Sequence, residues 1–152
     1  MAETKARTGF GAKFYVEASP FGAGAMPLIT AMKLVGELGD LAEPERSKDA
    51  VEATHMASPS GYREFISGLR DGGEIAVPFS TLAADDGQLA LDLAFDYDGA
   101  VYWALQIPTN PVMQWSGKGI LTGKSGDVPM EDKMAGQATL KITGKPTLAA
   151  VV

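Results

Sequence analysis

Residues 54–74 read THMASPSGYREFISGLRDGGE, a stretch that mixes turn residues with large apolar side chains. One proline and four glycines interrupt it, so the sequence predicts a long connection over residues 56–73 rather than a regular element. Connections of this length are uncommon in compact domains, and they are often functional or bound to a partner. The large apolar side chains that a partner could cover are Tyr62, Phe65, Ile66 and Leu69.

Strands are predicted on both sides of this connection. Over residues 49–55 Val51 and Ala53 share one face, and over residues 74–79 an apolar side chain occupies every second position, a period that is typical of β-strands. Because Pro78 has no N–H to donate to a ladder, the second of these strands is expected at a sheet edge or to end there. Further strands are predicted over residues 28–38, 101–107, 113–122 and 137–143.

A single helix is predicted between these strands, over about residues 86–97. Asp85 and Gln88 have the spacing of a capping box, in which Asp accepts from the third helical amide while Gln reaches back. Leu89, Leu93 and Tyr97 lie four residues apart, and Leu91 and Phe95 broaden the apolar side. Residues 88–96 are therefore expected to cover a sheet face.

The order of strands, one helix and more strands predicts a mainly β fold, an antiparallel β-sandwich or open barrel with one packed α-helix. No internal repeat and no shift in composition divides residues 1–152, so we expect a single domain. Residues 1–27 mix Gly, Ala, Pro and Thr with isolated aromatic residues and predict a flexible, extended N-terminal arm before a β-sandwich over residues 28–148.

Composition excludes several classes of function. The chain has no cysteine, so it lacks disulfides, thiolate nucleophiles and cysteine metal sites. A net charge of −6 has the wrong sign for tight nucleic-acid binding. No apolar run approaches the length of a membrane span and no secretion signal is recognised, so we expect synthesis in the cytosol and no membrane insertion.

The sequence offers no catalytic, metal or cofactor residues. His55 is the only histidine and is expected to have a structural role. The acidic groups around residues 96–98 and 127–132 lack the ligand spacing of a calcium loop, and Gly117-Lys118-Gly119 is not followed by a helix that could receive a phosphate. A non-enzymatic protein is therefore predicted, with a monomeric β-sandwich binding module or small hydrolase as the alternative.

Residues 54–74 resemble the signature of the major tail tube proteins of long-tailed, siphovirus-type bacteriophages. In that family a strand ending in Thr-His runs into a Ser-Pro-x-Gly-Tyr-Arg-Glu-Phe loop, and Gly-Leu-Arg-Asp leads to the next strand; this sequence has the same motifs in the same order. Asp-Gly-Gln at 86–88, Trp-x-Gly at 115–117 and Thr-Gly-Lys-Pro-Thr at 143–147 are also similar. The equivalent tail protein of gene transfer agents is similar too, and a secretion-type tube remains an alternative.

The resemblance implies a structural virion protein without cofactors. Its family forms homohexameric rings that stack into a tube, and double-stranded DNA passes through the tube into the host without specific binding. The implied partners are the tape measure, tail terminator and tail tip proteins. The implied location is the virion tail, assembled in the host bacterial cytoplasm.

The resemblance also implies where the interfaces lie. The long loop would contact the adjacent ring or subunit, whereas the rival expectation is that its apolar groups fold back onto their own core. An acidic lumen is expected to repel DNA phosphates, with Glu52 and Glu74 as candidate lumen residues. The candidate ring or subunit interface residues are Met56, Tyr62, Arg63, Phe65, Ile66, Leu69, Arg70 and Asp71.

Overall fold

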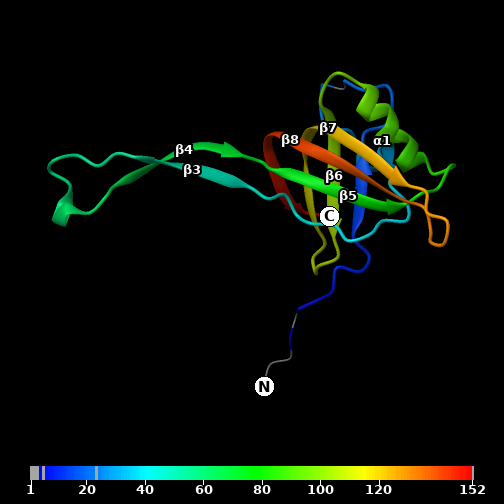
Figure 1. Ribbon diagram of the computed structural model, residues 1–152, viewed down its shortest axis with the longest axis horizontal. Coiled ribbons are helices and arrows are strands. Elements are labelled where there is room, and N and C mark those ends of the chain that lie inside the picture. Colours follow the sequence, from blue (N-terminus) through cyan, green and yellow to red (C-terminus); the bar gives the residue numbers. More distant parts are fainter. Residues whose placement is uncertain (1–3, 5, 23, 152) are drawn as a thin grey trace.

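The computed structural model describes residues 4, 6–22 and 24–151. It is mainly β with one helix, as predicted, and it consists of a body and a two-stranded hairpin that extends far from it (Figure 1). The body is one antiparallel sheet. Its strands, in spatial order, are β2 (Lys33–Leu34), β1 (Lys13–Val16), β6 (Val101–Ile107), β7 (Met113–Asp127), β8 (Ala135–Ala150) and β5 (Glu74–Ser80).

The segment that follows β2 joins the two edges of this sheet. β2 pairs with β1, and a few residues later the Gly39 amide donates to the Pro78 carbonyl while the Ser80 amide donates to the Glu37 carbonyl, both at 2.8 Å. The sheet therefore curls into an open barrel, and β5 is an edge strand as Pro78 predicts. These two hydrogen bonds pair only one end of the outer edge of β5.

The helix α1 (Asp86–Asp96) packs on the body through one face that combines small side chains with Leu91. Its buried positions include Ala90, Leu91 and Ala94. The prediction for Leu89, Leu93 and Tyr97 is wrong, because these side chains remain at least 37% exposed. Of the other two predicted residues, Leu91 is buried as expected and Phe95 is exposed. The first turn of the helix lies close against the backbone at the end of β2, where a Cβ at Gly87 would lie 2.1 Å from the Leu34 carbonyl oxygen.

The N-terminus of α1 confirms half of the predicted capping box. The Asp85 carboxylate accepts from the Gln88 amide at 3.0 Å. The Gln88 side chain does not reach back to Asp85; its Oε1 accepts from the Leu82 amide, and its Nε2 donates to the carbonyls of Gly36 and Ser80. The Gln88 side-chain amide thus satisfies three part-buried backbone groups, one in the segment after β2 and two at or just after the end of β5, and it joins α1 to both regions.

The predicted arm over residues 1–27 is partly wrong, because Lys13–Val16 is the strand β1, inserted between β2 and β6. Phe14 and Val16 are buried, and the Phe14 ring stacks on Trp103 with 6.3 Å between centroids. Four residues are too few for a local pattern to reveal. The predicted strand over 28–38 is reduced to a 3-10 turn, Ile29–Ala31, and β2. Arm residues 1–3, 5 and 23 lie outside the described part of the chain.

The projecting hairpin consists of β3 (Ser47–Glu52) and β4 (Phe65–Asp71). The prediction of an irregular connection over 56–73 is therefore wrong for β4, because pairing with β3 overrides the local turn tendency of Gly68. Irregular structure is confined to residues 53–64, which include a 3-10 turn, Pro59–Gly61. The described residues contain no helix of the length and hydrophobicity that a membrane span requires.

Candidate assembly interface

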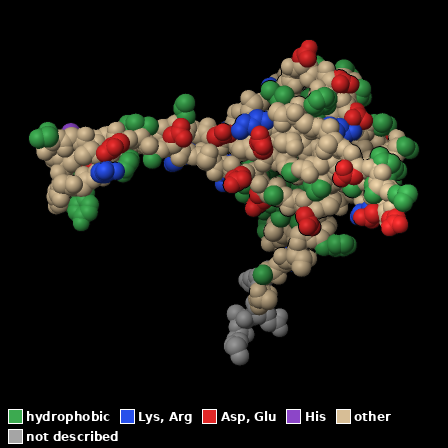
Figure 2. All heavy atoms as spheres, in the orientation of Figure 1, with side chains coloured by type: hydrophobic (Ala, Val, Ile, Leu, Met, Phe, Trp, Pro, Cys, Tyr) green, Lys and Arg blue, Asp and Glu red, His purple; other side chains and the backbone are tan. Residues whose placement is uncertain are grey.

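The hairpin exposes large apolar side chains over its whole length (Figure 2). Tyr62 is 76% exposed and Leu69 is 83% exposed. Because the hairpin points away from the body (Figure 1), these groups do not fold back onto their own core. The predicted interface residues that share this exposure are Met56, Tyr62, Phe65, Ile66 and Leu69.

Both faces of the hairpin carry such side chains. Val51 lies opposite Ile66 in the antiparallel register, so these two share one face, while Phe65 lies on the other face opposite Glu52. A two-stranded ribbon with no layer packed on either face is marginally stable in water. The hairpin thus presents apolar side chains on two faces that no other described element covers.

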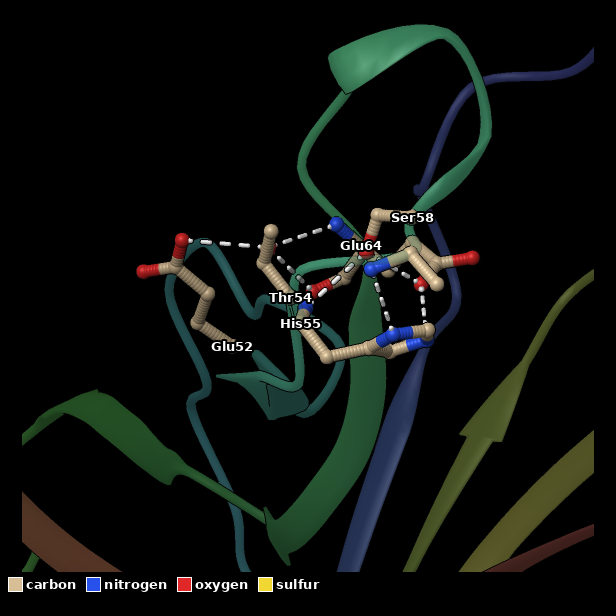
Figure 3. Close-up of polar contacts among 6 residues, drawn as sticks. Glu52, Thr54, His55, Ser58 and Glu64 are labelled. Carbon is tan, nitrogen blue, oxygen red and sulfur yellow. Dashed lines mark hydrogen bonds and ion pairs between the residues drawn. The ribbon is translucent and has the colours of Figure 1, made fainter.

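The turn at the end of the hairpin is held by a polar network (Figure 3). The Ser58 hydroxyl donates to Glu64 at 2.8 Å, and His55 Nε2 lies 3.3 Å from the same carboxylate. The Ala57 amide donates to His55 Nδ1 at 3.2 Å, and the Thr54 hydroxyl accepts from the Glu64 amide at 2.9 Å. This arrangement gives His55 the structural role predicted for it.

The same network does not have the geometry of a catalytic triad. A nucleophilic serine donates its proton to histidine, whereas the Ser58 hydroxyl donates to Glu64 and accepts from the His55 amide at 2.9 Å. Among the described residues no group of three or more histidine or acidic side chains could hold a metal ion. The tip is thus a fixed turn that displays Tyr62.

The root of the hairpin is tied to the body at two places. Asp71, a predicted interface residue, accepts from the Gly73 amide at 2.8 Å and pairs with Lys141 of β8 at 3.1 Å. The Gly73 hydrogen bond, followed by Lys141, lowers the pKa of Asp71. Before β3, the Arg46 guanidinium lies 4.7 Å from the centre of the Trp115 ring. These contacts fix the direction in which the hairpin leaves the body.

The remaining predicted residues are split between the hairpin and the body. Arg63 lies at the tip with Nε 3.9 Å from Glu52 Oε1, and Arg70 lies near the root opposite Lys48. Glu74 lies on β5 opposite Lys141. The structure therefore does not bring the two predicted lumen residues, Glu52 and Glu74, onto one element.

Glu74 belongs to the face of the sheet that the helix leaves uncovered. Cross-strand pairing places Lys13 beside Gln106, Lys118 beside Tyr102 and Lys141 beside Glu74 on this face. The Lys118 ammonium lies over the Tyr102 ring at 5.1 Å. The strands of the uncovered face thus carry more lysine than carboxylate, and the acidic residues of the chain gather elsewhere.

Sequence reasoning missed a second exposed apolar region, at the turn between β7 and β8. Val128 is 83% exposed and Met130 is 95% exposed. The signal was present as apolar residues inside a polar, acidic loop, but isolated methionines are ordinary in a sequence and give no spatial information.

Comparison with known proteins identifies the family to which this chain belongs. Residues 17–149 match the family described as lambda phage tail tube protein, so the chain belongs to that family. No curated protein matches the sequence. The resemblance seen in residues 54–74 is confirmed, and membership gives the chain a structural role in a tail tube.

Solved structures share the fold at low identity. The tail of an empty gene transfer agent particle, determined with C6 symmetry, is 17% identical with a TM-score of 0.72, covering 95% of this chain and 100% of that one. The SPP1 tail tube is 11% identical with a TM-score of 0.61, covering 93% and 77%. A sheath/tube terminator structure of an extracellular contractile injection system is 10% identical with a TM-score of 0.66, covering 98% and 100%.

Proposed function

We propose that copies of this chain form six-membered rings that stack into the tube of a phage or gene transfer agent tail, through which double-stranded DNA passes. The observation that carries this proposal is the projecting hairpin with apolar side chains on both faces. The similar gene transfer agent tail has C6 symmetry, which supports six copies per ring.

Burial of the hairpin supplies the driving force for assembly. Covering its apolar side chains stabilises the assembly by about 25 cal/mol for each Å² removed from water. Aromatic residues and arginine are favoured at interface centres, and Tyr62, Phe65, Arg63 and Arg70 supply them. Neither outer edge of the hairpin ladder belongs to a larger sheet in the single chain, so pairing with a neighbour also removes exposed backbone edges.

The uncovered sheet face lines the bore in this proposal. Its amide and hydroxyl side chains, such as Gln106, Gln114 and Ser116, give a hydrated surface without base-reading geometry, so DNA passes without specific binding. Glu74 faces the bore beside Lys141, and Glu52 contributes from the hairpin. The face carries more lysine than carboxylate and so differs from the acidic wall expected from net charge; Lys141 is partly neutralised by its ion pair with Asp71, which weakens its attraction for phosphates.

The proposed partners follow from the tube. A terminator and a tail tip protein cover its two ends, and a tape measure protein occupies the bore during assembly in the cytoplasm of the bacterial host. The role that we propose for the subunit is structural, and the arrangement of the polar network at the tip as a turn supports it.

Electron microscopy of the purified chain and its variants tests the proposal. Wild type is expected to form rings or tubes, and Tyr62→Asp and Phe65→Asp are expected to abolish them while circular dichroism stays unchanged. Leu89→Asp, which adds the same charge at an exposed apolar residue of α1 outside the hairpin, is the matched control and is expected to retain tubes. A wild-type chain that stays monomeric at high concentration contradicts the proposal.

A further inference from the structure

The turn between β7 and β8 lies at the opposite end of the long axis from the hairpin tip, residues 53–64 (Figure 1). We propose that this far end binds the hairpin tip of a second copy in the adjacent ring. The inference rests on the proposed function and names the receiving surface of the stacking contact. We call that surface the distal patch, and its apolar residues are Leu82, Val128, Met130 and Met134.

The distal patch is one continuous surface because its two loops are joined. The Thr81 amide donates to the Met134 carbonyl at 3.0 Å, which holds the loop after β5 against the loop before β8. The Asp127–Ala135 pair closes the β7–β8 ladder immediately beside the turn. Val128 and Met130 are therefore presented from the end of a long, paired ribbon.

Stacking into an open tube requires two unlike surfaces that fit each other. If hairpin tips paired with hairpin tips, the contact would be isologous and would close into a dimer. Each tip must therefore bind a different surface on the next copy. For copies arranged head to tail, that surface lies at the end of the molecule opposite its own hairpin tip. The distal patch satisfies this condition, since it is exposed, apolar and remote from the hairpin (Figures 1 and 2).

The charges of the two ends are complementary. The carboxylate at the tip, Glu64, is engaged by His55 and Ser58, whereas the Arg63 side chain is 77% exposed with only a 3.9 Å contact to Glu52. Around the distal patch, three carboxylates accompany a single lysine over residues 127–134. Arg63 of one copy thus meets an acidic rim on the next, while Met56 and Tyr62 meet the apolar residues of the distal patch.

The absence of cysteine from the sequence allows a direct test by engineered thiols. Ala57→Cys places a thiol on the tip, and Met130→Cys places one on the distal patch. Tubes of the double variant, treated with a short bis-maleimide, are expected to give a ladder of covalent oligomers on denaturing gels. The matched control, Ala57→Cys with Asp98→Cys beyond the end of the helix, is expected to give no ladder.

The cross-linking result distinguishes the inference about the distal patch from the proposed function. A ladder from the first pair alone supports the distal patch as the receiving surface. Normal tubes without that ladder overturn this inference and leave the proposed function intact. Failure of the wild-type chain to form tubes overturns the proposed function and this inference together.

Charge reversal gives a second, independent readout. Arg63→Glu is expected to raise the critical concentration for tube formation by about fivefold, the effect of losing one exposed ion pair. Adding Glu131→Lys and Asp132→Lys in the same chain is expected to restore assembly. If these lysines worsen the defect of Arg63→Glu, the acidic rim does not face Arg63.

Discussion

Lys141 Nζ lies 3.1 Å from Asp71 Oδ1, and this ion pair joins the last residue of the hairpin strand β4 to the middle of β8. The pair is exposed, so it contributes little to global stability. Its position matters more, because every contact that the hairpin makes with another copy depends on the angle at its root. Asp71, predicted as an interface residue, orients the hairpin in the single chain.

The pair predicts an acid-sensitive hairpin root. Folding lowers the pKa of Asp71, so its carboxylate stabilises the folded hairpin above its usual pKa, about 4, and this stabilisation is lost as the pH falls through the lowered pKa. At neutral pH, Asp71→Asn is therefore expected to speed amide hydrogen exchange in β4. Once the pH lies below the lowered pKa of Asp71, the wild type and the variant are expected to exchange alike when both are corrected for intrinsic rates.

Asp49→Asn is the matched control for this prediction. Asp49 lies on β3 and makes no ion pair among the described residues, so its replacement is expected to leave exchange in β4 unchanged. An equal difference between wild type and Asp71→Asn at neutral and acidic pH contradicts the role of the Asp71 carboxylate.

Gly87 sets the distance between α1 and the segment after β2. A Cβ at this position would lie 2.1 Å from the Leu34 carbonyl oxygen, a backbone atom that cannot turn aside. Gly87→Ala gains about 1 kcal/mol of helix propensity, but the clash costs more, about 1–3 kcal/mol or above. Urea unfolding is expected to report a net loss of stability.

Gly123→Ala is the control for the clash at Gly87, because it makes the same change of residue type at a position where no clash is expected. No atom lies within 4 Å of a Cβ built at Gly123, so its stability is expected to stay within about 0.5 kcal/mol of wild type. A Gly87→Ala chain as stable as Gly123→Ala would mean that α1 packs further from Leu34 than the structure has it.

Gln88 is expected to tolerate no loss of its amide group. Gln88→Glu keeps the acceptor for the Leu82 amide but leaves the carbonyls of Gly36 and Ser80 without a donor. An unpaired buried group costs about 1–3 kcal/mol, and these two carbonyls are part-buried, so a loss of about 1–2 kcal/mol is expected by urea unfolding. Gln137→Glu, on the exposed face of β8, is the control, and an equal effect from it contradicts the role of Gln88.

The body of the fold could be predicted where one face of a strand is buried. Over β6 the predicted alternation between Val101 and Ile107 matches the observed bounds of the strand. Trp103 and the side chains two residues before and after it all face the core. β1 could not be predicted, since its four residues become a strand only by pairing with β6. The same limit applies to β4, where Gly68 indicates a turn locally and pairing with β3 decides otherwise.

The candidate interface could be predicted from motif likeness rather than from the periodicity of apolar residues. Motif likeness pointed to residues 54–74, and exposure of Tyr62 and Leu69 on a projecting hairpin agrees with an interface there. Nothing local distinguished Asp71, which acts at the root, from Arg70 beside it. The role of the distal patch depends on which end of the molecule Met130 occupies, and that is a property of the folded chain alone.

The contact between Arg46 and Trp115 predicts a second control over the hairpin root. Trp115 Nε1 donates to Glu43 at 2.9 Å while the Arg46 guanidinium lies over its ring, so the segment that enters β3 is clamped from both sides. Arg46→Ala removes a cation–π contact of about 0.5–1 kcal/mol. It is expected to change tryptophan fluorescence, because the other tryptophan, Trp103, is fully buried and unaffected.

The same variant separates stability from assembly. Loosening the root lets the hairpin sample more directions, and ordering it again on assembly costs conformational entropy. Arg46→Ala is therefore expected to slow tube formation, measured by light scattering, more than its small loss of stability accounts for. Lys33→Ala, which removes an exposed cation of β2 outside the hairpin with no aromatic partner among the described contacts, is the control. Equal rates for the two variants would leave the clamp with a role in stability only.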